Sequence, residues 1–167
     1  SWRTSVFPQK SGGYLLPVYR NQTGLVYDPE KVPNPPQSWA DFTAWLDANP
    51  GQFAFNDPSK GGSGQAFVQA AILNILGDEG RYEGDTELDE KKVADWGKVW
   101  DWFNANQDKF TITASNNDSL DRVNQAEVLM AAAWDDDTAV SLSKGTLFKR
   151  AKLYIPAFGM PGARAMT

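Results

Sequence analysis

Residues 56–64 hold the first group of side chains that could bind or transform a small molecule. The stretch combines glycines with hydrogen-bonding residues, and its candidate ligand contacts are Asn56, Asp57, Ser59, Gly62 and Ser63. Glycines allow a ligand to approach the backbone closely, and amides at the start of a following helix attract an anion or a carbonyl oxygen. The spacing matches neither the dinucleotide-binding motif nor the phosphate loop. A turn that merely connects a strand to a helix is the competing interpretation.

The second candidate stretch reads Ser-Asn-Asn-Asp at residues 115–118. Its candidate ligand contacts are Ser115 and Asn116, whose side chains could fix the orientation of a polar ligand. The same residue types are favoured at helix starts whatever the function, so helix capping is the alternative. In that case Ser119 is another candidate cap.

The third stretch is Trp134 followed by three aspartates, with Asp135 and Asp136 as further candidate contacts. An aromatic face beside carboxylates suits an ammonium-bearing ligand, through cation–π and ion-pair attraction together. Acidic residues are also favoured in the first turn of a helix, which would make at least one aspartate structural.

The composition excludes most catalytic mechanisms. The chain contains no histidine and no cysteine, which removes the usual general base, the common nucleophile pairs and the commonest zinc ligands. The aspartate run does not match a calcium loop, so we expect neither a metal nor a cofactor. A hydrolase that uses Asp57 with Asp136 stays open, provided that the two carboxylates face each other in a cleft and one has a raised pKa.

The bulk properties favour one globular domain. The chain has 167 residues, 41% of them hydrophobic, and a formal net charge of −5. It shows no Lys/Arg cluster dense enough to follow a phosphate backbone, so nucleic acid is not expected as a partner. The longest apolar stretches fall well short of the roughly 20 residues that a membrane span needs.

The hydrophobic patterns predict strands that alternate with helices. Strands are expected at 14–18, 23–27, 52–55, 110–113, 128–133 and 151–155. Helices are expected to start at Ser38, with Asp41 completing a capping box, and to cover 64–76, 89–106, 119–125 and 135–143. The alternation predicts an α/β domain with a mainly parallel or mixed sheet covered on both faces. The loops that follow Phe55, Thr113 and Ala133 should then meet at one edge of the sheet, where ligands bind in such folds.

The helix expected at 89–106 is unusually rich in tryptophan. Val93, Trp96, Trp100 and Phe103 recur at helical spacing and are predicted to face the core. Trp102 lies off that stripe. A second alternative function is therefore a protein-interaction module that docks through an exposed Trp102.

The run from Val26 to Phe67 resembles the extracellular solute-binding proteins of bacterial ABC transporters. It carries, in the order found in that family, Tyr27-Asp28, Pro33 to Pro36, Ser38-Trp39, Pro50-Gly51, Asp57-Pro58 and Gly61 to Gly64. Residues 127–134 and 152–159 are similar to a later strand with its loop and to the strand that returns to the other lobe. One departure is Ala126, at a position where such proteins often carry glycine.

The resemblance implies a three-layer α/β/α lobe of a type II periplasmic-binding-protein-like fold. Residues 1–167 would be the contiguous second lobe of a two-lobed receptor, with the partner lobe absent. Hinge strands are expected near 17–23, where Arg20 and Asn21 lie, and near 154–158. The tail from 159 onward shows no periodicity.

The implied function is the capture of a small polar solute for an ABC importer, without chemistry, in the bacterial periplasm or outside the cell. The partners would be the solute, for which Trp134 and Asp135 favour a cationic or amine-bearing compound, and a membrane permease. A single lobe would bind weakly, because affinity comes from closing two lobes around the ligand. Its uncovered surface could also cause self-association.

Overall fold

The centre of the structure is a mixed five-stranded sheet in the order β6-β5-β7-β4-β8. The structure is a computed structural model, and its described residues are 5–6, 9–10, 19–77, 89–160 and 164–166. The sheet strands are β4 (Thr23–Tyr27), β5 (Phe53–Asn56), β6 (Phe110–Thr113), β7 (Met130–Trp134) and β8 (Lys152–Tyr154). β5 pairs in parallel with β6 and β7, whereas β4 is antiparallel to both β7 and β8. Within this sheet, β4 therefore runs against the other four strands.

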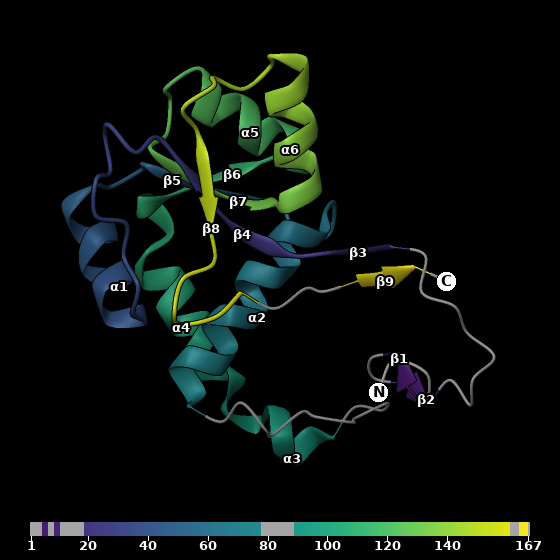
Figure 1. The fold of residues 1–167 in the computed structure, drawn as a ribbon. Helices are drawn as coiled ribbons and strands as arrows, with labels where there is room; N and C mark the ends of the chain where they lie inside the picture. Colours follow the sequence, from purple (N-terminus) through teal and green to yellow (C-terminus); the bar gives the residue numbers. More distant parts are fainter. Residues whose placement is uncertain (1–4, 7–8, 11–18, 78–88, 161–163, 167) are drawn as a thin grey trace.

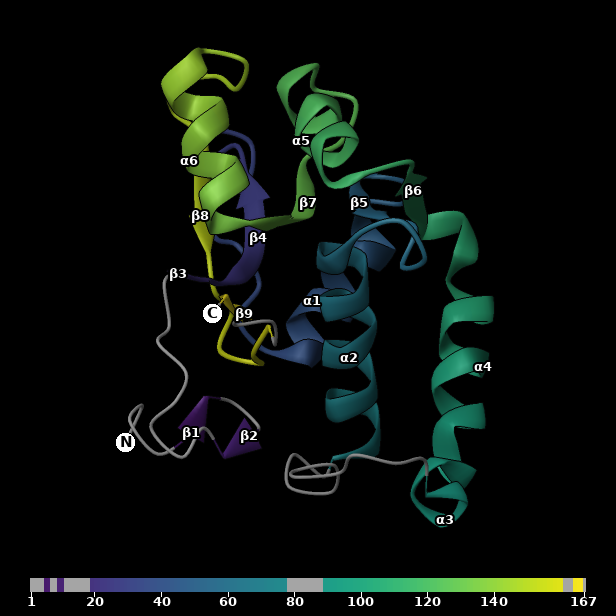
Figure 2. The same cartoon turned by 90° about the vertical axis from the view of Figure 1, so that its right-hand side faces the viewer.

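Helices cover both faces of the sheet and complete three layers (Figures 1 and 2). One face carries α1 (Trp39–Ala48), α2 (Gly62–Leu76) and α4 (Gly97–Ala105), and the other carries α5 (Asn116–Asn124) and α6 (Asp135–Lys144). The short α3 (Glu90–Val93) and the 3₁₀ turns at Ala94–Trp96 and Gln107–Lys109 flank α4. The predicted α/β/α architecture is confirmed, with a mixed sheet. Among the described residues, no helix combines the length and the apolar character that a membrane crossing requires.

The two faces of the sheet differ in side-chain size. Successive residues of a strand point to opposite faces, so each strand divides its side chains between the two helical layers. On β5, Phe53 and Phe55 pack into the aromatic cluster with α1 and α2, while Ala54 packs with α5. On β7, Ala131 and Ala133 face α5 and α6 in the same way. These small side chains allow α5 and α6 to pack close to this face of the sheet.

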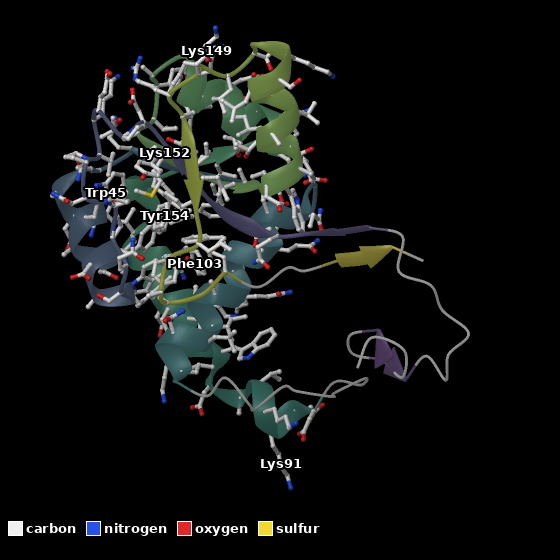
Figure 3. The ribbon with its side chains drawn as sticks, viewed as in Figure 1. Trp45, Lys91, Phe103, Lys149, Lys152 and Tyr154 are labelled. Atoms are coloured by element: carbon white, nitrogen blue, oxygen red, sulfur yellow. The ribbon has the colours of Figure 1, made fainter. Side chains whose placement is uncertain are left out.

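The connection between β4 and α1 is held in place at both of its ends. Asp28 follows β4 and accepts hydrogen bonds from Arg150, while the Tyr154 hydroxyl donates to the Pro36 carbonyl at 2.8 Å. Figure 3 shows Tyr154 and Lys152 on β8. Ser38 then caps α1: its hydroxyl accepts from the Asp41 amide at 3.0 Å, and the Asp41 carboxylate accepts from the Ser38 amide at 3.3 Å. The predicted capping box is confirmed.

The orientation predicted for the tryptophan-rich helix is confirmed for Trp96 and Phe103, which pack against the core, and is wrong for Trp100. Trp100 is 43% exposed and Val99 is fully buried, whereas Trp102 packs with its ring 5.1 Å from that of Trp39. The continuous helix expected from residue 89 is interrupted by the 3₁₀ turn at Ala94–Trp96. A 3₁₀ turn has about 3.0 residues per turn instead of 3.6, so it rotates the following helix relative to the expected stripe. Trp102 is therefore partly buried against the core, and it is not the exposed docking residue that the interaction-module alternative requires.

Two short strands that are far apart in the sequence pair with each other outside the main sheet. β3 (Tyr19–Asn21) pairs in an antiparallel manner with β9 (Arg164–Met166), and the pair extends away from the sheet in Figure 1. The tail after residue 159 therefore contains a strand that the absence of periodicity did not predict, because its partner lies far away in the sequence. β1 (Ser5–Val6) and β2 (Gln9–Lys10) form a separate pair. The strand predicted at 14–18 lies outside the described residues.

Ala126 occupies a backbone conformation that favours glycine. Its φ of 59° lies in the left-handed region, where a Cβ atom costs about 1–2 kcal/mol. The substitution Ala126→Gly relieves this strain but adds conformational freedom to the unfolded chain. We expect it to raise the free energy of unfolding by about 0.5–1 kcal/mol, measured by urea denaturation.

Ala139 provides the control for that measurement. It is exposed on α6, so Ala139→Gly should lower the free energy of unfolding by about 1 kcal/mol. A loss of stability in both variants would contradict the strain at Ala126.

The ion pair between Asp28 and Arg150 should make stability depend on pH. Asp28 is 4% exposed and accepts from Nε and Nη2 of Arg150 at 2.9 and 2.6 Å, which lowers the pKa of its carboxyl. Because the pKa of Asp28 is lower in the folded protein than in the unfolded chain, where it is about 3.9, the ion pair contributes its full stability at pH values above 3.9. That contribution is lost as the pH falls through the pKa of the folded state. Because Arg150 is exposed, we expect Asp28→Asn to cost about 1–2 kcal/mol at pH 7. Thermal unfolding between pH 2 and 7 measures this cost, which should shrink at the acid end, with exposed Asp121→Asn as the neutral control.

Candidate functional site

The ends of four strands meet at one edge of the sheet. β5, β6 and β7 finish there, and β4 begins there because it runs in the opposite direction, with Thr23 paired to Trp134. The edge holds a pocket of about 470 Å³. Its lining residues are Asn21, Ser59, Lys60, Gly61, Gly62, Gln65, Asn116, Trp134, Asp136 and Asp137. The three loops that were predicted to meet therefore do meet.

The pocket lining overlaps only partly with the predicted contacts. The predicted residues that border it are Ser59, Gly62, Asn116, Trp134 and Asp136, together with Asn21 from the predicted hinge. The sequence reasoning missed Lys60, Gly61, Gln65 and Asp137. Lys60 and Gly61 lie within the first candidate stretch, and Asp137 lies in the aspartate run after Trp134. Gln65 could not be found, because α2 begins at Gly62 and not at residue 64, which brings its first turn to the pocket.

A buried polar cluster beneath the pocket joins two of the loops. Asn56 is fully buried, and its carboxamide oxygen accepts from the Ser63 hydroxyl at 2.6 Å and from the Gly64 amide at 2.7 Å. The Ser63 hydroxyl also lies within hydrogen-bond distance of the Asn116 carboxamide oxygen, at 2.8 Å. Asn56 and Ser63 are thus placed where they hold the pocket in shape, one layer below its lining.

Two further predicted contacts, Asp57 and Ser115, organise their own loops. Asp57 accepts from the hydroxyl and the amide of Ser59 at 2.7 and 2.9 Å, and these hydrogen bonds lower its pKa. Ser115 caps α5, because its hydroxyl accepts from the Asp118 amide at 3.1 Å. Ser119 is buried, and its hydroxyl lies 2.7 Å from the hydroxyl of Thr113. Asp57 is absent from the pocket lining and its pKa is shifted downward. The facing carboxylate pair that the hydrolase alternative requires is therefore not formed by Asp57 and Asp136.

Gly62 provides the space for the Trp134 ring. A Cβ atom at Gly62 would lie 2.7 Å from Cζ2 of that ring, well inside contact distance. The neighbouring Gly64 is under a stricter limit, since its Cβ atom would lie 1.9 Å from the Asn56 carbonyl oxygen. Trp134 itself is only 8% exposed, so its ring offers the pocket a small part of its surface.

Asp135 connects the start of α6 to the segment between β3 and β4. Its carboxylate accepts from the amides of Gln22 and Asp136, each at 2.9 Å, and its own amide donates to the Gln22 carbonyl at 2.9 Å. The Gln22 side chain in turn donates to the Met160 carbonyl at 2.5 Å. Asp135 is exposed but does not border the pocket. These hydrogen bonds indicate that Asp135 positions the start of α6 against the segment before β4.

The α6 side of the pocket is negatively charged. Asp136 and Asp137 both border the pocket in the first turn of α6. Burial raises the pKa of Asp137, and the neighbouring charge of Asp136 raises it further. A cation close to Asp137 would oppose both effects, because a positive charge favours the ionised carboxylate. Within the described residues, no cluster of three or more acidic side chains could hold a metal ion.

The contact between Gly62 and Trp134 can be tested by substitution. We expect Gly62→Ala to displace the Trp134 ring and to lower the free energy of unfolding by about 1–3 kcal/mol, the usual cost of overpacking. Near-ultraviolet circular dichroism and urea denaturation measure the two effects. The matched control is Gly97→Ala in α4, where a Cβ atom meets no neighbour within 4 Å. An unchanged ring environment in Gly62→Ala would contradict the contact.

Residues 3–159 match the family described as bacterial extracellular solute-binding proteins. A search of proteins with curated functions gives no significant match.

Several solved structures share the fold. An ABC transporter protein from Clostridium perfringens is 19% identical with a TM-score of 0.59, and the alignment covers 82% of this chain and 38% of that one. The spermidine/putrescine ABC transporter substrate-binding protein from Streptococcus pneumoniae is 14% identical with a TM-score of 0.59, covering 86% and 38%. Iron-bound HitA from Pseudomonas aeruginosa is 21% identical with a TM-score of 0.54, covering 86% and 39%.

These identities are low, so the solved structures establish a shared fold and no shared solute. The chain spans only 38–39% of the length of those three structures. The family match extends over nearly the whole sequence. The chain therefore belongs to the family of bacterial extracellular solute-binding proteins.

Proposed function

We propose that this chain forms one wall of the cleft in which a bacterial ABC importer receptor captures a small polar solute. The observation that carries the proposal is the pocket at the meeting point of four strand ends in a member of this family. Hydrogen-bonding and charged side chains line it, as expected of a site that orients a solute without transforming it. The solute would then pass to a membrane permease, with capture taking place in the periplasm or outside the cell.

A two-lobed receptor agrees with the length of the similar structures, which are more than twice as long as the part that this chain covers. We place the hinge at β3, which contains Arg20 and Asn21, and at its partner β9. The segment expected to hold the second hinge strand, residues 154–158, packs into the lobe instead. Phe158 lies against Trp39, with ring centroids 5.4 Å apart, and donates its amide to the Gln37 carbonyl. The β3–β9 pair is the better candidate because it leaves the sheet.

The link from Gln22 to Asp135 would couple this hinge to the solute site. Gln22 follows β3 directly, and Asp135 precedes the two pocket aspartates. A movement of β3 relative to the sheet would therefore change the position of the first turn of α6. Asp135, which was predicted to contact the solute, would act by holding the site in register with the hinge.

The solute class that fits the α6 side of the pocket carries an ammonium group. Asp136 and Asp137 offer two carboxylates, and the exposed part of the Trp134 ring adds an aromatic surface. A cation would offset the desolvation and the repulsion that raise the pKa of Asp137. The argument rests on these side chains and not on the solutes of proteins that share the fold.

The general proposal is tested by thermal-shift measurements against a panel of small metabolites. A compound that binds only the folded state raises the melting temperature in proportion to the logarithm of its concentration. We expect polar, amine-bearing compounds to give the shifts and neutral apolar compounds to give none. Turnover of any panel compound, detected by chromatography, would contradict capture without chemistry.

The acidic half of the pocket is tested with n-butylamine as the probe. We expect Asp136→Asn and Asp137→Asn each to weaken butylamine binding about five- to tenfold, since each removes a charge-assisted hydrogen bond. Titration followed by the Trp134 indole NMR signal measures the affinity. Asp121→Asn, an equal change of charge at an exposed residue outside the pocket, should leave it unaltered.

The pH dependence of that binding gives a second readout. The raised pKa means that Asp137 takes up a proton at a higher pH than an ordinary aspartate, whose pKa is about 3.9. Butylamine affinity should therefore begin to fall above that pH as the solution is acidified, and Asp137→Asn should remove this part of the pH dependence. Equal affinity in all three aspartate variants would refute the amine assignment.

A further inference from the structure

The hydroxyl group of Ser63 lies between two side-chain amides, those of Asn56 and Asn116. Its oxygen is 2.6 Å from Oδ1 of Asn56 and 2.8 Å from Oδ1 of Asn116. A serine hydroxyl has a single hydrogen, so it can donate to only one of these two neighbours. Ser63 and Asn56 are both fully buried, and a contact between two oxygens without a hydrogen is costly at such a depth. One of the two amides therefore has to donate to Ser63.

The orientation of Asn56 is fixed by two other hydrogen bonds. Its Oδ1 accepts from the Gly64 amide at 2.7 Å, and its Nδ2 donates to the Asp57 carbonyl at 2.8 Å. Turning this side-chain amide over would lose both bonds, because a backbone carbonyl only accepts and a backbone amide only donates. Asn56 thus presents an oxygen to Ser63 and receives its hydrogen.

The side chain of Asn116 has no bond of that strength to hold Oδ1 toward Ser63. Its other contact is with the Ser63 backbone amide at 3.4 Å, which is long for a hydrogen bond. With Oδ1 toward the hydroxyl, two oxygens stand 2.8 Å apart and share no hydrogen. With the amide turned over, Nδ2 donates to the hydroxyl at the same distance, and only the long contact is given up. The two ends of a carboxamide have nearly the same shape, so this turn requires no other movement.

The end of the Asn116 amide that points away from Ser63 is the end that a solute can reach. Asn116 borders the pocket and is half-buried at the start of α5. The end near Ser63 is also covered by Gly61, where a Cβ atom would lie 2.7 Å from it. The opposite end bonds to no residue in the part of the chain that the structure describes. The turned amide therefore offers a carbonyl oxygen, which only accepts, to the pocket.

We propose that Asn116 is a specificity-determining residue that donates its NH₂ group to Ser63 and accepts a hydrogen bond from the solute. This inference rests on the proposed function of the pocket, but it concerns only this donor and holds whichever group of the solute meets α6. Lys60, next to Gly61 in the chain, also borders the pocket, and its positive charge disfavours a cationic donor nearby. The group of the solute that fits Asn116 is therefore a neutral hydroxyl or N–H group.

The orientation of Asn116 is tested without any ligand, by NMR of its side-chain amide hydrogens. We expect them to show nuclear Overhauser effects to the Ser63 Hβ atoms. They should also exchange with water about tenfold more slowly than those of Asn117, because the hydrogen bond to Ser63 has to open first. Asn117 is the matched control, since it is the next residue in the chain and is exposed. Exchange as fast as that of Asn117 would overturn the orientation.

The choice of solute is tested with 4-amino-1-butanol, its methyl ether 4-methoxybutylamine, and n-butylamine. We expect the alcohol to bind about fivefold more tightly than either of the other two, because only it can donate a hydrogen bond to Asn116. Isothermal titration and the Trp134 indole NMR signal give the affinities. The corresponding six-carbon compounds cover a longer separation between the two groups, and 4-aminobutanamide distinguishes an N–H donor from a hydroxyl.

The variant Ser63→Ala tests whether the network selects the donor. Without the Ser63 hydroxyl, the Asn116 amide can turn either way and can donate to the ether oxygen, so the preference for the alcohol should fall to about twofold or less. The matched control is Ser119→Ala. Ser119 is also a fully buried serine on a helix, and its hydroxyl bonds to that of Thr113, but it does not border the pocket. This control should keep the fivefold preference.

The outcomes separate this inference from the proposed function. Equal binding of the alcohol and its ether at both chain lengths would overturn the role of Asn116 and leave solute capture standing. A fivefold preference that persists in Ser63→Ala would overturn the selection of the donor by the network. If no alcohol binds while another compound of the metabolite panel raises the melting temperature, the donor assignment fails and the proposed function survives. A panel without any binding compound would overturn the proposed function as well.

Discussion

The buried side chain of Asn56 is the interaction on which the candidate site depends. It stands at the last position of β5, with no exposure to solvent, and its carboxamide bonds to the helix that follows and to the loop between them. An unpaired amide at such a depth would be costly, so the position tolerates only a side chain that satisfies every neighbour at once. Ser63 extends the same network to Asn116 at the start of α5. Two loops from different strands are thereby held at one fixed separation.

The reversed direction of β4 has an equally general effect on the site. In an all-parallel sheet, the pocket would receive loops from strand ends alone. Because β4 begins where β5, β6 and β7 end, the segment before it also reaches the pocket and supplies Asn21. The same reversal brings Gln22 against Asp135 and joins the β3–β9 pair to the start of α6. A hinge placed at that pair would be in direct contact with the elements that line the pocket.

The distribution of charge gives the pocket its chemical character. Asp136 and Asp137 stand side by side at the start of α6, a position that the helix dipole favours and that their mutual repulsion opposes. Across the pocket, the start of α2 has no acidic residue in its first turn, and glycines expose its backbone. The starts of two helices therefore border one pocket, and of these two starts only that of α6 carries carboxylates in its first turn.

Much of this could be predicted from the sequence because it depends on neighbours along the chain. Local patterns were enough to predict the alternating strands and helices, the capping box at Ser38, the strand Phe110–Thr113 and the loops that meet at one edge of the sheet.

Contacts between distant residues needed the tertiary structure. The sequence placed Asn56 and Asp135 among the solute contacts, but burial and long-range hydrogen bonds put the first below the pocket and tie the second to Gln22. It also left Trp102 off the predicted core stripe, because a single 3₁₀ turn that changes the phase of a helix leaves no clear pattern in the residue types. The type of each residue thus determined what chemistry was available, and the packing of the sheet decided which side chains reach the pocket.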